Sequence, residues 1–214
     1  MVEPATSSPA STAASASPTG AVFLLRLVLI AVAYILTGMV GRLLLLSSGY
    51  VSPVWPAAGL ALVALLVCGP RYWPGVWIGA FLLNLWLDVS IAGMAVASLT
   101  AAGTTLQALL GARLTRRLVD AAVPLAHEMD VWRFLLLAGP LACLLSASVG
   151  VAVLYGFGRL PMAEVGNQWL VWWVGDVLGV LLFAPVALLA WPGRPAPWAR
   201  SGTRVALPLL IAGT

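Results

Sequence analysis

Residues 168–191, QWLVWWVGDVLGVLLFAPVALLAW, form an apolar run of 24 residues with one charged side chain, Asp176. A helix of about 20 residues crosses the ~30 Å hydrocarbon core of a bilayer, so this run predicts a membrane-spanning helix. Five apolar segments precede it, at residues 21–46, 54–69, 72–88, 91–112 and 131–155, and another begins at residue 205. The pattern predicts an all-α, polytopic transmembrane helical bundle with six full spans and the start of a seventh, although segments 54–69 and 72–88 are short.

The composition favours the same architecture. Of the 214 residues, 62% are hydrophobic and only 8% are charged, and the mean hydropathy is +1.03. Soluble domains carry about 25% charged residues, so this chain cannot cover a soluble globule with a hydrated surface. Soluble enzymes, nucleic-acid-binding proteins and disordered proteins are therefore disfavoured, and the lipid bilayer is the expected partner.

The arginines predict the orientation of the bundle. All 11 basic residues are Arg. With the N-terminus in the cytoplasm, eight arginines of the connecting segments lie inside and only Arg42 and Arg159 lie outside, as the positive-inside rule requires. We expect a multi-pass protein of the bacterial plasma (inner) membrane. Residues 1–20, rich in Ser, Pro and Ala, are expected to be a disordered cytoplasmic tail, and residues 21–214 an integral-membrane domain that is incomplete at its C-terminus.

Asp176 is the first candidate for a functional residue. A charge inside a membrane helix is costly unless it is paired or neutralised, and such residues commonly bind ligands or protons. Two readings remain open for it: a structural ion pair with Arg42, or a direct ligand or proton role. Trp172 and Trp173 flank Asp176 and are candidates for the same site.

Three further residues are expected at the same depth. Asn84 and Asp88 are four residues apart and share one helix face, and Trp55 precedes the second apolar helix. Together with Asp176 and Arg42 they predict a ligand or signal site in the outer half of the bundle. Asp88 could instead face water at a helix end, and Trp55 could instead anchor the chain at the membrane interface.

Glycine pairs predict where helices pack closely. Gly75 with Gly79, and Gly175 with Gly179, form GxxxG patterns that let neighbouring backbones approach. The single histidine, His127, is expected in a hydrated loop, and no metal-ligand cluster, nucleophile motif or phosphate loop is present in the sequence. The sequence therefore predicts no enzyme activity, no cofactor and no metal site in this chain.

Two stretches resemble a known family. Residues 52–85, SPVWPAAGLALVALLVCGPRYWPGVWIGAFLLNL, and residues 168–185, QWLVWWVGDVLGVLLFAP, are similar to the first class of bacterial membrane-associated sensor domains, the MASE family. The resemblance implies a helical module of about eight spans at the N-terminus of histidine kinases or diguanylate cyclases. The residues that match its pattern are Trp55, Pro56, Gly59, Trp73, Pro74, Gly75, Trp172, Trp173, Gly175, Asp176, Gly179 and Pro185.

The expected function is that of a sensory input domain. It would detect an unidentified small-molecule or protein signal and relay it to a cytoplasmic output module of a longer parent protein, through which we also expect a homodimer. A polytopic bundle with one buried acid could instead be a small-molecule transporter subunit. It could also be a membrane scaffold that recruits partner proteins through its GxxxG faces.

Overall fold

The computed structural model describes residues 20–43, 52–118 and 139–190, and no β-strand occurs among them. Six α-helices account for most of these residues: α1 (Gly20–Leu43), α2 (Pro56–Cys68), α3 (Trp73–Leu85), α4 (Ile91–Leu118), α6 (Gly139–Gly156) and α7 (Val165–Ala190). Each helix falls on one of the six predicted apolar segments, so the all-α bundle is confirmed. Residues 1–19, the loop around His127 and the segment from residue 205 lie outside the described residues.

The predicted number of full spans was too high. Four helical segments of the described residues are long and apolar enough to cross a membrane: Gly20–Leu43, Ile91–Arg117, Gly139–Gly156 and Met162–Leu188. Helices α2 and α3 have 13 residues each, about 20 Å at 1.5 Å per residue, which is less than the ~30 Å of the hydrocarbon core. They are short helices inside a bundle of longer ones.

Helix α2 is short because the chain enters the bundle in a non-helical form. Pro53 and Pro56 both disfavour helix in the residue before them, so residues 52–55 stay outside the helix. The backbone N–H of Trp55 donates to the carbonyl oxygen of Gly175 at 2.9 Å. Gly175 lies ten residues after the first residue of α7, about 15 Å along the helix axis. Helix α2 therefore begins deep inside the bundle, where neighbouring protein satisfies its backbone groups.

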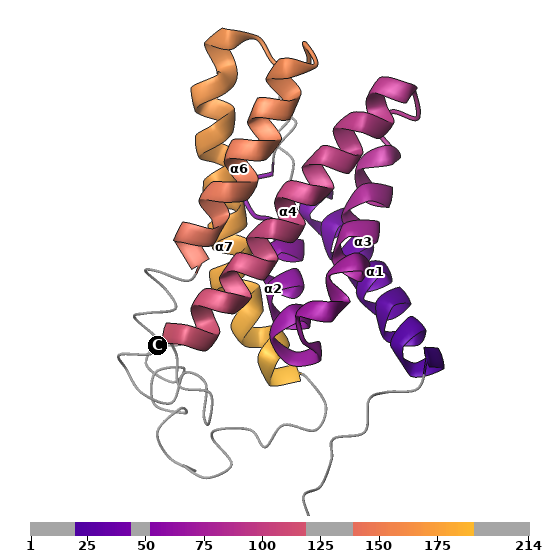
Figure 1. The fold of residues 1–214 in the computed structure, drawn as a ribbon. Coiled ribbons are helices and arrows are strands. Elements are labelled where there is room, and N and C mark those ends of the chain that lie inside the picture. Colours follow the sequence, from indigo (N-terminus) through magenta and orange to yellow (C-terminus); the bar gives the residue numbers. More distant parts are fainter. Residues whose placement is uncertain (1–19, 44–51, 119–138, 191–214) are drawn as a thin grey trace, which may run out of the picture.

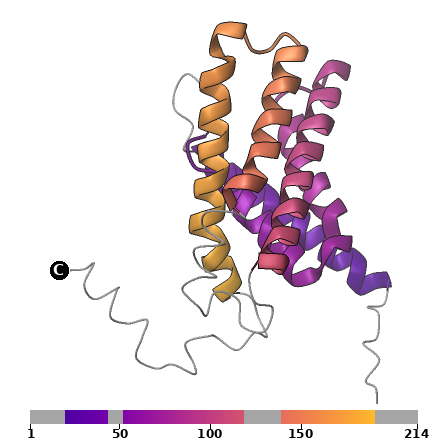
Figure 2. The same ribbon diagram turned by 60° about the vertical axis from the view of Figure 1, so that its left-hand side comes forward.

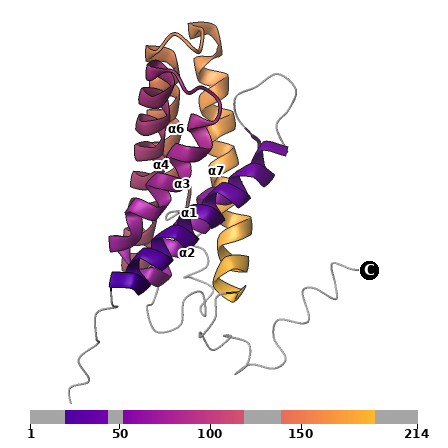
Figure 3. The same ribbon diagram turned by 90° about the vertical axis from the view of Figure 1, so that its right-hand side faces the viewer.

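The other helices surround α2. Helix α2 packs against α7, α1 and α4, and nearly all of its first ten residues are buried. Helices α3, α4, α6 and α7 form a row in chain order, in which α3 packs on α4, α4 on α6 and α6 on α7 (Figure 1, Figure 2). Helix α1 packs on α3 and α2 and crosses the bundle obliquely (Figure 3). The lipid-facing surface of α1 is apolar, with exposed Leu and Val side chains along its length.

The glycine pairs lie where α3 meets α1 and where α7 meets the non-helical segment 52–55. A Cβ on Gly179 would overlap the carbonyl oxygen of Trp55, and a Cβ on Gly175 would overlap that of Ser52. A Cβ on Gly75 would lie 2.9 Å from the Leu27 carbonyl oxygen in α1. Gly175 and Gly179 therefore permit close contact between α7 and the non-helical segment 52–55, and this contact positions the start of α2.

Arg116 joins the last turn of α4 to the last turns of α2. Its guanidinium, in the last turn of α4, donates to the carbonyl oxygens of Leu65 at 2.5 Å and Leu66 at 3.3 Å, near the end of α2. The last carbonyls of a helix have no partner within that helix, and a cation is favourable there. Helix α2 is thus held at its start by α7 and near its end by α4.

Candidate functional site

A cavity of about 60 Å³ lies where the non-helical segment meets the helices. A water molecule needs about 10–15 Å³ of such a volume, so the cavity has room for a few waters or a very small ligand. It is lined by residues of α1, the segment 52–55, α3, α4 and α7: Tyr34, Ser52, Trp55, Asn84, Thr100, Thr104, Trp172 and Asp176. Four predicted site residues, Asp176, Asn84, Trp55 and Trp172, meet in this cavity.

Asp176 is the charged group of the cavity. Its side chain is 2% exposed, and Ser146 of α6 and Trp172 lie beside the carboxyl. Its Oδ2 atom nevertheless has no hydrogen-bond partner among the described residues. A buried carboxylate without a partner is strongly unfavourable, so the site favours a proton or an added cationic or hydrogen-bonding group.

Two other polar side chains of the cavity donate hydrogen bonds to backbone carbonyl oxygens. The Ser52 hydroxyl donates to the carbonyl oxygen of Val54 at 2.8 Å, and the Asn84 amide donates to the carbonyl oxygen of Ala80 at 2.8 Å. The Ser52 hydroxyl hydrogen and one of the two amide N–H groups of Asn84 are therefore used inside the protein, while the Ser52 oxygen and the Asn84 carbonyl oxygen can still accept. The indole N–H of Trp55 points to the Tyr34 hydroxyl at 3.5 Å.

Arg42 does not pair with Asp176. Its guanidinium donates to the carbonyl oxygen of Leu83 in α3 at 2.5 Å, and no ion pair joins Arg42 to Asp176 in the part of the chain that the structure describes. The pairing was predicted from equal depth along two upright helices. Helix α1 packs on α3 and α2, and Gly38 and Arg42 near its C-terminal end both contact Leu83 of α3.

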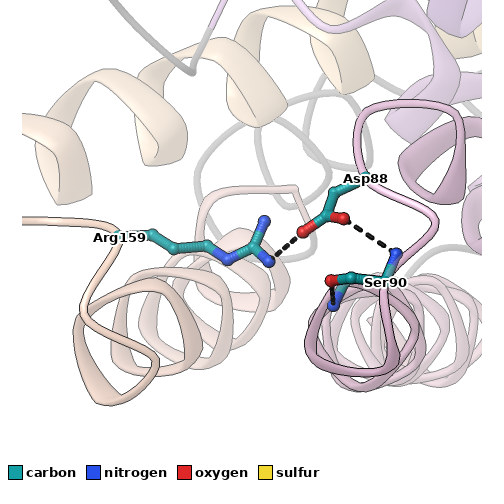
Figure 4. A network of polar contacts seen from close by, with 4 residues as sticks. Asp88, Ser90 and Arg159 are labelled. Atoms are coloured by element: carbon teal, nitrogen blue, oxygen red, sulfur yellow. Dashed lines mark hydrogen bonds and ion pairs between the residues drawn. The ribbon is translucent and has the colours of Figure 1, made fainter.

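Trp173 and Asp88 also lie away from the cavity. The Trp173 indole donates to the carbonyl oxygen of Pro140 in α6 at 3.0 Å. Asp88 follows α3 at the upper end of the bundle, where it forms an ion pair with Arg159 in the connection between α6 and α7 (Figure 4). Its other oxygen accepts the backbone N–H of Ser90 at 2.8 Å. Asp88 thus ties two connections together and does not contribute to the cavity.

The sequence comparison agrees with this description. The MASE1 family model matches residues 25–212 of the 214 residues. The chain belongs to the MASE1 family. MASE1 domains are membrane-associated sensor domains of bacterial signalling proteins, so this chain is a multi-pass membrane protein with the sensory input role of that family. No curated protein and no solved structure matches it.

Four lining residues of this MASE1 domain were missed by the sequence reading: Tyr34, Ser52, Thr100 and Thr104. Thr100 and Thr104 are four residues apart and therefore share a helix face, a polar stripe that could have indicated the site. Tyr34 is a lone polar aromatic residue within an apolar helix, and Ser52 precedes a proline. No group of three or more His, Cys, Asp or Glu side chains within the described ranges could hold a metal ion.

The ion pair at the upper end of the MASE1 domain gives a pH prediction. The hydrogen bond from the Ser90 N–H and the contact with Arg159 lower the pKa of Asp88 from 3.8 to about 2. A carboxyl with a depressed pKa in the folded state stabilises the fold above its unfolded pKa, and that stability is lost as the pH falls through the folded pKa. We expect the thermal midpoint difference between the wild-type protein and Asp88→Asn in detergent to shrink as the pH falls from about 5 to about 2. A difference that stays constant over this range would contradict the assigned role of Asp88.

Proposed function

We propose that this MASE1 domain detects its signal in the Asp176 cavity and relays it to a cytoplasmic output module, a histidine kinase or a diguanylate cyclase. In this proposal the catalytic activity belongs to the longer signalling protein, which also brings two copies of the domain together in the bacterial inner membrane. The observation that carries the proposal is the buried Asp176 carboxyl, whose Oδ2 lacks a partner among the described residues and lines a small polar cavity.

A site of this kind suits a sensor because it can bias two helix arrangements. A ligand shifts a conformational equilibrium only through different affinities for the two states. An occupant that donates a hydrogen bond to the unpartnered Oδ2 of Asp176 stabilises the helix arrangement in which this bond can form. Binding therefore changes the free-energy difference between that arrangement and the other one. The cavity touches α1, α3, α4 and α7 at once, so the arrangement of all four helices depends on its occupant.

One observation favours the transporter alternative. Non-helical backbone buried at membrane depth, as in the segment 52–55, is also typical of substrate sites in secondary transporters. Uptake of a labelled solute into proteoliposomes distinguishes the two functions. A sensor shows no uptake above that of empty liposomes, whereas a transporter accumulates the solute and responds to substitutions in the cavity.

Filling the cavity tests the sensor proposal. Thr100→Leu places a larger apolar side chain among the lining residues, and we expect the signal response of the full signalling protein to fall at least about tenfold. Ala102→Leu, on a half-buried position of the same helix outside the lining, is the matched control. A normal response of Thr100→Leu, with output activity measured in membranes that contain equal amounts of protein, contradicts signal detection in this cavity.

The proposed orientation places the N-terminus and the connection between α4 and α6 in the cytoplasm. The eight-to-two distribution of arginines supports it. A single cysteine at Ala121, in a protein that lacks Cys68 and Cys143, is expected to resist membrane-impermeant thiol reagents in intact cells and to react after permeabilisation. Efficient labelling before permeabilisation would reverse the orientation.

A further inference from the structure

The chemistry of the cavity lining restricts what can occupy it. The eight lining residues include one carboxyl and no Arg, Lys or His. The guanidinium that sequence alone places near Asp176, that of Arg42, instead donates to a carbonyl oxygen of α3. The cavity therefore contains a negative group without a compensating cation from its own lining, and a ligand with positive charge would supply one.

The arrangement of acceptors indicates a cation that carries N–H donors. Asp176 Oδ2 has no partner among the described residues, and the Ser52 hydroxyl and one of the two N–H groups of Asn84 are already bound to backbone carbonyls. The oxygens of these three side chains can accept hydrogen bonds from an occupant. The Trp55 and Trp172 indoles in the lining add aromatic rings, whose faces attract cations.

The space present distinguishes such a ligand from a bare proton. Neutralising a carboxyl by protonation requires no cavity, yet about 60 Å³ is open beside Asp176. A volume of this size admits a few waters or a ligand of only a few heavy atoms. A drug-sized or nucleotide-sized molecule does not fit.

We propose that the Asp176 cavity binds a small ammonium-type cation, with its N–H groups donated to Asp176 and Asn84. This inference rests on the proposed function in taking the cavity as the signal site, and it adds the chemical class of the ligand. The size of the cavity restricts the cation to one with a few heavy atoms. Methylammonium is the simplest probe of this class.

Binding can be measured on the purified full chain in detergent through its thermal unfolding midpoint, because a ligand that binds only the folded state raises that midpoint. We expect methylammonium chloride to raise the midpoint of the wild-type chain in a saturable way. Sodium chloride and tetraethylammonium chloride at equal ionic strength are expected to give no saturable rise, since neither cation offers N–H donors and the second exceeds the cavity.

Two variants and one control make the test specific. Asp176→Asn removes the charge with little change in size and is expected to weaken the methylammonium effect at least about tenfold. Thr100→Leu fills the cavity and is expected to abolish the effect, which provides a second test if Asp176→Asn does not fold. Asp88→Asn removes an acid outside the cavity and is expected to respond like the wild-type chain.

Several results would overturn the inference: no saturable rise with methylammonium, an equal rise with sodium or tetraethylammonium, or an unchanged rise in Asp176→Asn. A midpoint that depends on pH through Asp176 but not on methylammonium would assign the site to a proton instead. These outcomes are separate from failure of the proposed function. Binding without any effect of Thr100→Leu on output would leave the cation site intact and remove its signalling role.

Discussion

Asp176→Asn in the full signalling protein is expected to fix the output at one level while the protein reaches the membrane in near-normal amounts. The substitution keeps the size of the side chain and removes its charge. Because Oδ2 has no partner among the described residues, no described hydrogen bond to that atom is broken. Coupling between sites is typically about 1–3 kcal/mol, so we expect the response to the signal to fall by about 5- to 150-fold. Output activity as a function of signal, normalised to membrane protein, measures this loss.

Two control variants separate the cavity from its surroundings. Asp88→Asn removes an acid at the upper end of the bundle and is expected to respond normally. Arg42→Gln is expected to differ from Asp176→Asn, because Arg42 contacts the Leu83 carbonyl and forms no described ion pair with Asp176. A normal response of Asp176→Asn would refute the site, and its disappearance from the membrane would assign Asp176 a structural role.

Gly179→Val is expected to prevent folding of the domain. A Cβ at this position would overlap the carbonyl oxygen of Trp55, and this backbone atom cannot move without displacing the start of α2. Overpacking in a well-packed region typically costs about 1–3 kcal/mol, and a clash with fixed backbone lies at or above the upper end of that range. We expect little or no monodisperse protein by size-exclusion chromatography after extraction from membranes.

Gly166→Val is the matched control for this prediction. Gly166 lies in the first turn of the same helix, is exposed, and would have no heavy atom within 4 Å of an added Cβ. A surface substitution of this kind usually changes stability by no more than about 0.5 kcal/mol. Equal yields of folded protein for Gly179→Val and Gly166→Val would show that α7 and the segment 52–55 are not in close contact.

Hydropathy predicted the helices well but not how far two of them extend. Every apolar segment within the described residues contains a helix, because burying backbone in lipid requires helical hydrogen bonds. The segment 54–69 was counted as a span because its side chains are apolar. Its length in the fold is limited by Pro53 and Pro56, and by the hydrogen bond from Trp55 to Gly175. That bond joins residues far apart in the sequence, so a hydropathy profile cannot predict it.

The candidate site was predicted in part for a similar reason. Asp176 and Asn84 stand out because polar groups in apolar helices are costly, and both line the cavity. The ion pair of Asp176 with Arg42, one of the two interpretations left open, is absent from the described residues, since equal depth along the sequence gives no information about the tilt of α1. Thr100 and Thr104 share one helix face, so their spacing indicates a polar stripe, but only the packing of α4 against the other helices shows that this stripe lines the cavity.

Helix α2 is attached to its neighbours at two places, to α7 just before its start and to α4 near its end. Its first turn adjoins the cavity through Trp55, and its last turns are bound by Arg116. A helix of 13 residues is only about 20 Å long and stiff over that length. A displacement of the first turn of α2 would therefore also displace its last turns, and with them the bound Arg116 side chain. Arg116 lies two residues before the end of α4, so α2 connects the cavity to the C-terminal turn of α4.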